Sequence, residues 1–179
     1  MRRVVIVYGL ISGVIAGALM WILVTFVKNG SISFDGGVSW GYATMIVALS
    51  LVFFGVKSYR DTHGGQITFL KGVQVGILIS LISAVCYAAT WEVYHRTGLG
   101  QEFIQKYTVY YLDKMKHDGA SETDIEKARA EGEQFMALYN NFFVRFGMTL
   151  MEILPVGVIV TLVSAALLRK REVLPAEPA

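Results

Sequence analysis

The sequence predicts an all-α membrane protein: a bundle of four transmembrane helices with an extramembrane helical pair between the third and the fourth. Three observations support this fold class. Hydrophobic residues make up 54% of the 179 residues and charged residues only 17%, whereas a soluble domain carries about a quarter charged residues. Four long apolar runs contain most of the hydrophobic residues and almost no charge. The segment between the last two runs instead mixes apolar and polar residues with helical periodicity.

The four apolar runs are the expected transmembrane helices. At about 1.5 Å per residue, each run would extend roughly 28–36 Å, which is enough to cross a hydrocarbon core of about 30 Å. The runs are continuous rather than periodic, and this excludes the surface helices of a soluble protein. We therefore expect one integral-membrane domain over residues 1–179, with transmembrane helices at residues 4–27, 38–56, 72–91 and 146–168.

The start of the first run has some features of a secretory signal peptide. Met1-Arg2-Arg3 precede an apolar stretch, and Ala16-Gly17-Ala18 resembles a cleavage site. The apolar run continues to Val27, however, and is longer than the apolar region of a usual signal peptide. We therefore interpret residues 4–27 as an uncleaved transmembrane helix.

Small residues recur every fourth position in this first helix, at Gly9, Gly13 and Gly17. Small side chains let two helix backbones approach closely within a membrane. A dimerisation face and packing inside the bundle both fit the pattern. We favour packing inside the bundle, because such spacing is common in transmembrane helices of every kind.

Residues 75–84 and 156–165 have similar sequences, each with Val-Gly at the start and Ser-Ala at the end. Inverted repeats are typical of transporters. Runs drawn from Val, Ile, Leu, Gly and Ser resemble one another by composition alone, however, and the first two helices carry no corresponding repeat. We interpret the similarity as coincidence.

Basic residues predict the orientation, because Lys and Arg favour the cytoplasmic side of a membrane. They cluster before the first run, in the second loop and after the fourth run: Arg2 and Arg3; Lys57, Arg60 and Lys71; Arg169, Lys170 and Arg171. Both termini are therefore predicted to be cytoplasmic, with residues 169–179 forming a tail that is first basic and then rich in Pro and Ala. Trp21, Trp40 and Trp91 would then lie at the external ends of the helices, at the headgroup level that Trp prefers.

The third loop is predicted to form two extramembrane helices, at residues 101–118 and 121–141. Gly119 ends the first, and Ser121 with Asp124 three residues later is typical of a helix N-cap. Apolar stripes run along both helices, so we expect these faces to pack on each other or to lie on the headgroup layer. No proline separates the second helix from the fourth apolar run. We therefore expect one continuous helix over residues 121–168, whose outer half projects beyond the membrane or bends over it at Gly132.

Glu152 is the only formal charge inside the four runs. An acid inside a membrane costs about 2.5–3.5 kcal/mol on insertion scales, and this makes it a functional-site hypothesis. Arg145 shares its helix face, and Pro155 removes the hydrogen bond to the Met151 carbonyl. Two roles stay open: a structural hydrogen bond to a neighbour such as Tyr87 or Thr90, and the binding of a proton or substrate.

No catalytic, metal-binding or nucleotide-binding motif accompanies these features. His63, His95 and His117 lack the spacing of metal ligands, and we expect them to be solvated. Cys86 has no partner for an intramolecular disulfide, and no basic patch interleaved with aromatics suggests nucleic acid. The expectation is a protein that is not an enzyme and needs no cofactor. Gly64-Gly65 is expected to form a turn, with Thr68 as the N-cap of the third transmembrane helix.

Four strings in the sequence carry a family resemblance. They are Phe53-Phe54-Gly55-Val56-Lys57-Ser58-Tyr59-Arg60-Asp61 with Gly64-Gly65-Gln66-Ile67-Thr68-Phe69-Leu70-Lys71, and Met151-Glu152-Ile153-Leu154-Pro155-Val156-Gly157 with the terminal Leu168-Arg169-Lys170. The chain thereby resembles, over nearly its whole length, a bacterial membrane family known as domain of unknown function 4199. The resemblance implies a four-helix protein of the bacterial inner membrane, in which the loop with Lys57, Arg60 and Asp61 is cytoplasmic and a further candidate functional segment. It implies no activity.

Two functions fit the sequence. The leading hypothesis is an accessory, assembly or interaction protein that acts through helix packing and the external helical pair. The alternative is a small oligomeric transporter or channel with Glu152 as its proton- or substrate-coupled acid. The lipid bilayer is the expected environment, and a second copy or an unidentified membrane protein is the expected partner.

Overall fold

The structure, a computed structural model, describes residues 1–169 and consists there of six helices. They are α1 (Arg2–Lys28), α2 (Phe34–Asp61), α3 (Phe69–Arg96), α4 (Leu99–His117), α5 (Glu122–Tyr139) and α6 (Phe142–Leu168). Helices α1, α2, α3 and α6 are long and apolar enough to cross a membrane. The predicted all-α class with four spanning helices is therefore confirmed. The predicted tail, apart from Arg169, lies outside the described residues.

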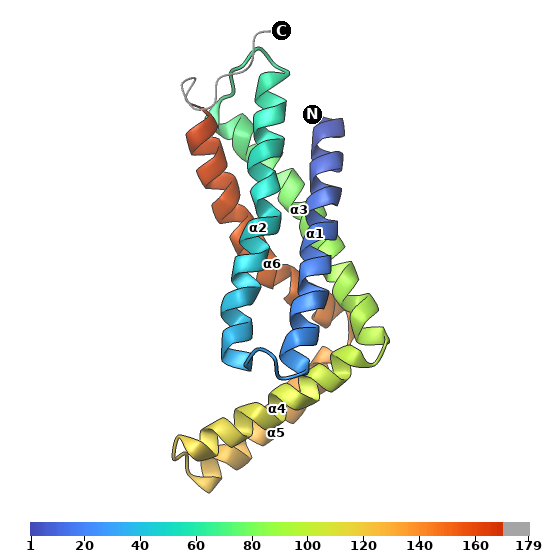
Figure 1. The fold of residues 1–179 in the computed structure, drawn as a ribbon, viewed down its shortest axis with the longest axis vertical. Coiled ribbons are helices and arrows are strands. Elements are labelled where there is room, and N and C mark those ends of the chain that lie inside the picture. Colours follow the sequence, from blue (N-terminus) through green and yellow to red (C-terminus); the bar gives the residue numbers. More distant parts are fainter. Residues whose placement is uncertain (170–179) are drawn as a thin grey trace.

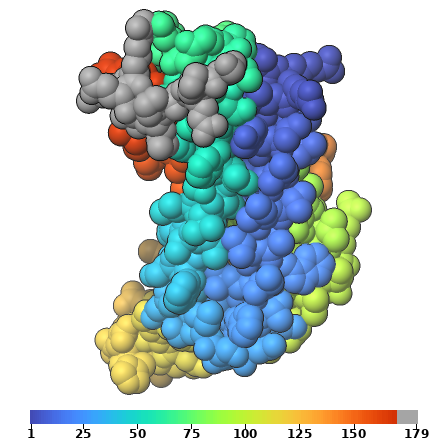
Figure 2. Space-filling model, turned by 45° about the horizontal axis from the view of Figure 1, so that its top comes forward, coloured from blue at the N-terminus to red at the C-terminus, as the bar shows by residue number. Residues whose placement is uncertain are grey.

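The four long helices form an elongated bundle with two different ends (Figure 1). The N-terminus, the α2–α3 loop and the last turn of α6 lie together at one end, which we call the basic end because Arg2, Arg3, Lys57, Arg60 and Lys71 belong to it. Helices α4 and α5 lie at the opposite end and project obliquely from the bundle. We call this antiparallel pair, residues 99–139, the arm. Figure 2 shows the arm reaching beyond the surface formed by α1 and α2.

The glycines of α1 face α3, as intramolecular packing requires. A Cβ atom on Gly13 would lie 2.5 Å from Cys86 Cβ and 3.1 Å from the Ser83 backbone, and one on Gly9 would lie 2.7 Å from Ile82 Cβ. Gly17 stands in the same way against Thr90. Because a real side chain would have no room at these positions, the glycines set the distance between α1 and α3.

A second contact of this kind joins α3 to α6, and it involves the two similar segments 75–84 and 156–165. Gly76 packs against Thr161, and Gly157 packs against Ser80. The Ser80 and Thr161 hydroxyls are 3.2 Å apart and form a hydrogen bond. The glycine of each segment thus packs against the hydroxyl residue of the other. This reciprocal pattern is the one expected where a two-fold axis relates two antiparallel helices. The similarity that we interpreted as coincidence marks the two halves of one interface.

Side-chain caps explain where several helices begin. The hydroxyls of Ser33, Thr68 and Ser121 accept hydrogen bonds from the backbone N–H groups of Gly36, Lys71 and Asp124. These caps satisfy N–H groups that have no partner inside the helix. Thr68 and Ser121 therefore have the roles that the sequence predicted. Gly119, with φ at +82°, ends the turn after α4 in the left-handed conformation that favours glycine.

The prediction of one continuous helix from residue 121 to residue 168 is wrong. The chain breaks after Tyr139, and Asn141 caps a new helix: its side-chain oxygen accepts from the backbone N–H groups of Phe143 and Val144. Asparagine competes for the backbone with its own side chain, and it therefore favours helix starts over helix interiors. The corner lies at Asn140 and Asn141, and Gly132 stays inside α5 without a bend being needed there.

The arm is held against the ends of α1 and α2 mainly through α4. The Phe34 ring contacts the rings of Phe103, Tyr107 and Tyr110 at centroid distances of 5.6, 5.6 and 5.0 Å. Lys28 pairs with Glu102 at 2.9 Å, and Asp35 accepts from Lys114 at 2.7 Å. Since partly exposed ion pairs contribute little, the aromatic cluster around Phe34 is the stronger part of this contact.

The close contact between α1 and α3 gives a test. Replacing Gly13 with Ile places a branched side chain against Cys86 and Ser83, so the helices must separate and lose packing. We expect the free energy of unfolding in detergent to fall by about 1–3 kcal/mol, the usual cost of overpacking. Chemical or thermal unfolding followed by tryptophan fluorescence measures it.

Gly147→Ile is the matched control, because nothing within 4 Å of Gly147 would meet its Cβ. This control should unfold like the wild type. If Gly13→Ile also unfolds like the wild type, the close contact of α1 with α3 does not exist as described.

Candidate functional site

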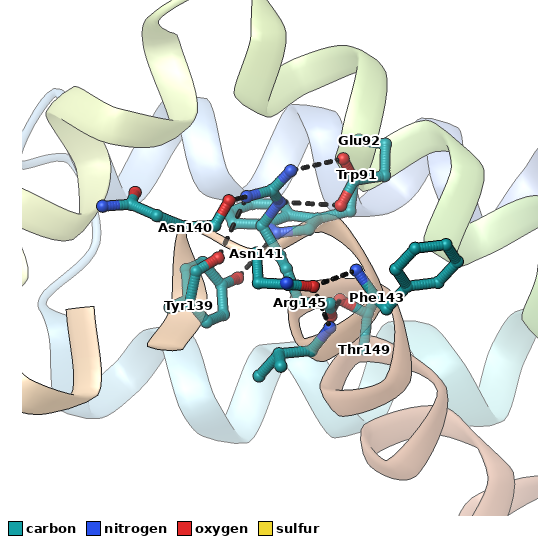
Figure 3. Close-up of polar contacts among 9 residues, drawn as sticks. Trp91, Glu92, Tyr139, Asn140, Asn141, Phe143, Arg145 and Thr149 are labelled. Carbon is teal, nitrogen blue, oxygen red and sulfur yellow. Dashed lines mark hydrogen bonds and ion pairs between the residues drawn. The ribbon is translucent and has the colours of Figure 1, made fainter. Parts of the chain in front are cut away.

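A buried ion pair joins the arm-end half of α6 to α3. Arg145, on the first turn of α6, donates through Nε and Nη2 to the two carboxylate oxygens of Glu92, each at 2.7 Å. Its Nη1 atom donates to the backbone carbonyl of Tyr139 at 3.0 Å and faces that of Asn140 at 3.4 Å. Figure 3 shows the guanidinium enclosed between Glu92 and the corner of the chain. Both charged side chains are only 7% exposed, so the pair replaces water with protein partners on every side.

Tyr139 continues this network toward the centre of the arm end. Its hydroxyl accepts a hydrogen bond from Trp91 Nε1 at 2.7 Å. Burial raises the pKa of Tyr139 to about 12, so the phenol is neutral at physiological pH. Trp91 was expected at the headgroup level. It is buried under the arm and stacked on Tyr94 at 5.7 Å, and its depth in the membrane stays a prediction.

The expectation that His95 is solvated is wrong. Helix α3 continues to Arg96, beyond the apolar run, and this carries His95 into the contact between α3 and the arm. His95 is buried, with its ring 6.3 Å from that of Tyr139. Its Nε2 atom has no hydrogen-bond partner among the described residues. The histidines at 63 and 117 are exposed.

A cavity of about 460 Å³ lies beside this network, at the arm end of the bundle. All six helices contribute to its lining. The lining residues are Met20, Leu23, Val24, Val27, Phe34, Gly37, Val38, Gly41, Tyr42, Thr44, Met45, Tyr87, Trp91, Phe103, Ile104, Tyr107, Phe135, Tyr139, Met148, Thr149 and Glu152. We call this the arm-end pocket. Its volume falls in the range of small-molecule sites, about 300–1,000 Å³, and its wall is mostly apolar, as such sites are.

The arm-end pocket has a closed back and an open front. At the back, Met20, Tyr87 and Trp91 of α1 and α3 are buried. At the front, Val38 and Tyr42 of α2 are 59% and 52% exposed, and Met148 of α6 is also exposed. The pocket therefore opens sideways between α2 and α6, two of the helices that can span a membrane, and below the arm, where the lining residues Tyr107 and Phe135 are also exposed.

Glu152 is the acid of this pocket. No hydrogen bond or ion pair joins its carboxylate to a described residue, because Arg145, two turns earlier on α6, is engaged by Glu92. The hydrogen bond to Thr90 that the sequence left open does not form, since the Thr90 hydroxyl donates to the Cys86 carbonyl. Tyr87 lines the same pocket as Glu152 without a hydrogen bond between them. Pro155 lies one turn further along α6, on an exposed face and outside the lining.

The second candidate segment lies at the other end of the bundle. Asp61 accepts from Lys57 at 2.6 Å and from Arg60 Nε at 3.0 Å, and Arg60 is only 1% exposed. This cluster belongs to the last turn of α2, at the basic end. The structure thus does not bring Lys57, Arg60 and Asp61 together with Glu152 and Arg145. A group of three or more His, Cys, Asp or Glu side chains suited to a metal ion does not occur within residues 1–169.

The sequence analysis missed the partners Glu92, Trp91 and Tyr139. Glu92 directly follows the apolar run at residues 72–91, and it was therefore assigned to a loop. One feature of the sequence pointed to it. The apolar run at residues 72–91 ends on the side of the membrane where Arg145 lies, and an acid and a base can pair there. Glu92 and Arg145 are 53 positions apart in the sequence, and the segment between them holds the two extramembrane helices, so without its path the pair was not apparent.

Fold and site together define a class: a four-helix membrane bundle with an arm at one end and a pocket beneath it. The chain belongs to the family described as protein of unknown function DUF4199, whose sequence profile matches residues 7–170. The resemblance noted above is thereby confirmed. Neither the search of curated proteins nor that of solved structures found a match.

The ion pair generates a prediction about the corner of the chain. Arg145→Met leaves the Glu92 carboxylate buried without a partner, and breaking such a pair costs about 3–5 kcal/mol. We expect a loss of that size in the free energy of unfolding, together with faster amide hydrogen exchange at residues 133–140. Exchange measured by mass spectrometry, in the same detergent as the unfolding, separates the local effect from the global one.

Two controls accompany this variant. Lys127→Met removes one partner of an exposed pair, that with Glu131 at 3.9 Å, and should change stability by less than about 1 kcal/mol. The double variant Glu92→Leu/Arg145→Met leaves no unpaired charge and should recover part of the loss. An Arg145→Met protein as stable as the Lys127→Met protein would contradict the structural role of the pair.

Proposed function

We propose that this protein is a membrane-embedded binding protein that takes a small amphiphilic molecule into the arm-end pocket, with Glu152 as the polar anchor. The observation that carries the proposal is an apolar pocket, open toward the membrane, with one unpaired carboxylate in its wall. An acid without a partner in a membrane-spanning helix is costly. Its presence is accounted for if a ligand supplies the missing partner.

The rest of the bundle favours binding over conduction. Between the pocket and the basic end, α3 meets α1 and α6 through glycine contacts, and Ser12 donates to the Ala48 carbonyl at 2.8 Å. Packing of this kind brings the helices close together between the pocket and the basic end. A transporter using Glu152 would therefore need a second arrangement of the helices, whereas a binding protein needs none. The proposal is for binding and not for catalysis.

A second function is supported by the outward face of the arm. Val109 of α4 is 60% exposed and lies on the helix face opposite the Phe34 cluster, whereas Tyr111, 47% exposed, stacks on Tyr107 of that cluster. We propose as the second candidate that this face joins two copies of the chain, which would make the protein an interaction module. Val109→Cys in a Cys86→Ser background would then form a disulfide-linked dimer in native membranes, whereas Lys127→Cys would not. A Val109→Cys protein that stays monomeric under oxidation excludes this candidate.

The binding function is tested with a neutral fluorescent amphiphile, N-phenyl-1-naphthylamine, on the full chain in lipid nanodiscs. Trp91 lines the pocket and serves as energy donor once Trp21 and Trp40 are replaced by Phe. We expect saturable energy transfer above that of empty nanodiscs. Gly41→Leu should abolish it, because Gly41 faces the pocket with its nearest obstacle, Leu23 Cδ2, 4.0 Å away, so the new side chain fills the space without displacing a helix.

The control is Gly147→Leu, on α6 but outside the lining, which should bind the probe like the parent protein. Energy transfer that rises linearly with probe in the parent protein, or that Gly41→Leu leaves intact, would overturn the binding function.

For the location we propose the bacterial inner membrane with both termini cytoplasmic. In support of it, the basic residues of the N-terminus and of the α2–α3 loop gather at the end of the bundle opposite the arm (Figure 1). Positive residues favour the cytoplasmic face. The arm would then lie outside.

Thiol labelling of intact cells tests this orientation in a Cys86→Ser background. Thr62→Cys at the basic end should be protected from an impermeant maleimide until the cells are opened, and Lys127→Cys on the arm should react at once. Both positions are exposed, so burial does not confuse the result. Labelling at 62 with protection at 127 would reverse the orientation.

A further inference from the structure

The chemistry of the arm-end pocket points to one class of ligand. We propose that the pocket binds an amphiphilic organic cation, with its charge beside Glu152 and its apolar part against the aromatic wall. This inference rests on the proposed binding function and names the ligand of that same pocket. It is carried by the charge of the wall, the kind of apolar surface and the direction of the opening.

The charges in the wall of the arm-end pocket favour a cation. Glu152 is the only acid among the described lining residues, and no Lys, Arg or His lines the pocket with it. Arg145, the cation nearest to Glu152 on α6, is saturated by Glu92 and two backbone carbonyls. An anionic ligand would therefore bring a second negative charge next to Glu152 with nothing to compensate it. A cationic ligand would supply the partner for the Glu152 carboxylate that no described side chain provides.

The second step concerns the apolar wall, which is unusually rich in rings. They come from Phe34, Tyr42, Tyr87, Trp91, Phe103, Tyr107, Phe135 and Tyr139. An aromatic face carries a negative quadrupole and attracts a cation within about 6 Å, most strongly where water is excluded. The Trp91 N–H donates to the Tyr139 hydroxyl, so Trp91 presents ring surface rather than a free donor. A wall that had to hold a neutral chain would need only aliphatic residues.

The direction in which the pocket opens limits which cations can reach it. The pocket opens between α2 and α6, with Val38, Tyr42 and Met148 at its rim. A ligand that enters there comes from the bilayer or its interface, and must therefore partition into lipid before it binds. Small hydrophilic cations such as metal ions do not partition in this way. The opening thus selects cations whose charge is spread over, or attached to, an apolar body.

The test compares two probes of the same shape and opposite charge, tetraphenylphosphonium and tetraphenylborate. Binding is measured by equilibrium dialysis to the full chain in nanodiscs of uncharged phosphatidylcholine, with empty nanodiscs subtracted. We expect one saturable site for tetraphenylphosphonium, with an affinity at least about tenfold above that for tetraphenylborate. Glu152→Gln should lower the tetraphenylphosphonium affinity about tenfold or more and remove the preference for the cation.

Matched variants separate charge from shape. Glu152→Asp keeps the carboxylate and should retain the cation preference, and Glu133→Gln, which removes an exposed acid of α5, should bind like the wild type. Gly41→Leu should block the site, and Gly147→Leu should leave it open. Folding of each variant is checked by its unfolding midpoint in the same lipid.

The outcomes distinguish the two proposals. If N-phenyl-1-naphthylamine binds in the pocket but tetraphenylborate matches tetraphenylphosphonium, or Glu152→Gln keeps the cation affinity, the ligand class is wrong and the binding function stands. If no probe gives a site that Gly41→Leu removes, the binding function itself fails. A cation preference that depends on Glu152 and is lost in Gly41→Leu supports both.

Discussion

The buried ion pair of Arg145 with Glu92 is the interaction on which the arm end depends. It joins α3 to α6, and through the carbonyls of Tyr139 and Asn140 it also holds the last turn of the arm. Two acids could pair with Arg145. The fold brings Glu92 of α3 beside it, and Glu152 lies two turns further along the same helix, α6. Because Arg145 pairs with Glu92 through both nitrogens of its fork, Glu152 is left with a free carboxylate. The stability of the corner and the free carboxylate of Glu152 in the pocket thus both follow from the pairing of Arg145 with Glu92.

The two halves of the bundle are built by opposite means. Toward the basic end, glycines let the backbones approach closely at both interfaces of α3, and a hydroxyl pair forms a hydrogen bond across each: Ser12 with Ser83, and Ser80 with Thr161. Toward the arm end, large rings and methionines replace the small residues. Large side chains keep backbones apart, and residues of the arm complete the wall of the pocket. The closely packed half at the basic end therefore stabilises the bundle, while the half at the arm end can contain a pocket.

Sequence reasoning reached the parts of this structure that depend on local pattern. Continuous apolar runs predicted the spanning helices, and cap residues such as Thr68 and Ser121 predicted two helix starts, because solvent and cap geometry act within a few residues. Contacts between distant segments were missed or misread. Glu92 and His95 looked like loop residues because the apolar run stops at Trp91, although the helix does not. The break at Asn141 was hidden by an apolar stripe that continues on both sides of it.

The same contrast explains why Glu152 could be singled out from the sequence while its role could not. A lone acid in an apolar run is visible at once, since the cost of burying it depends on composition alone. Whether it is structural depends on what faces it, and the nearest candidates were Tyr87, Thr90 and Arg145. Thr90 bonds its own helix, and Arg145 is taken by Glu92. Tyr87 shares the pocket without bonding to the acid. With Thr90 and Arg145 engaged elsewhere, the carboxylate lies in a pocket wall rich in rings without a partner among the described residues, and this geometry is why ligand binding is proposed for it.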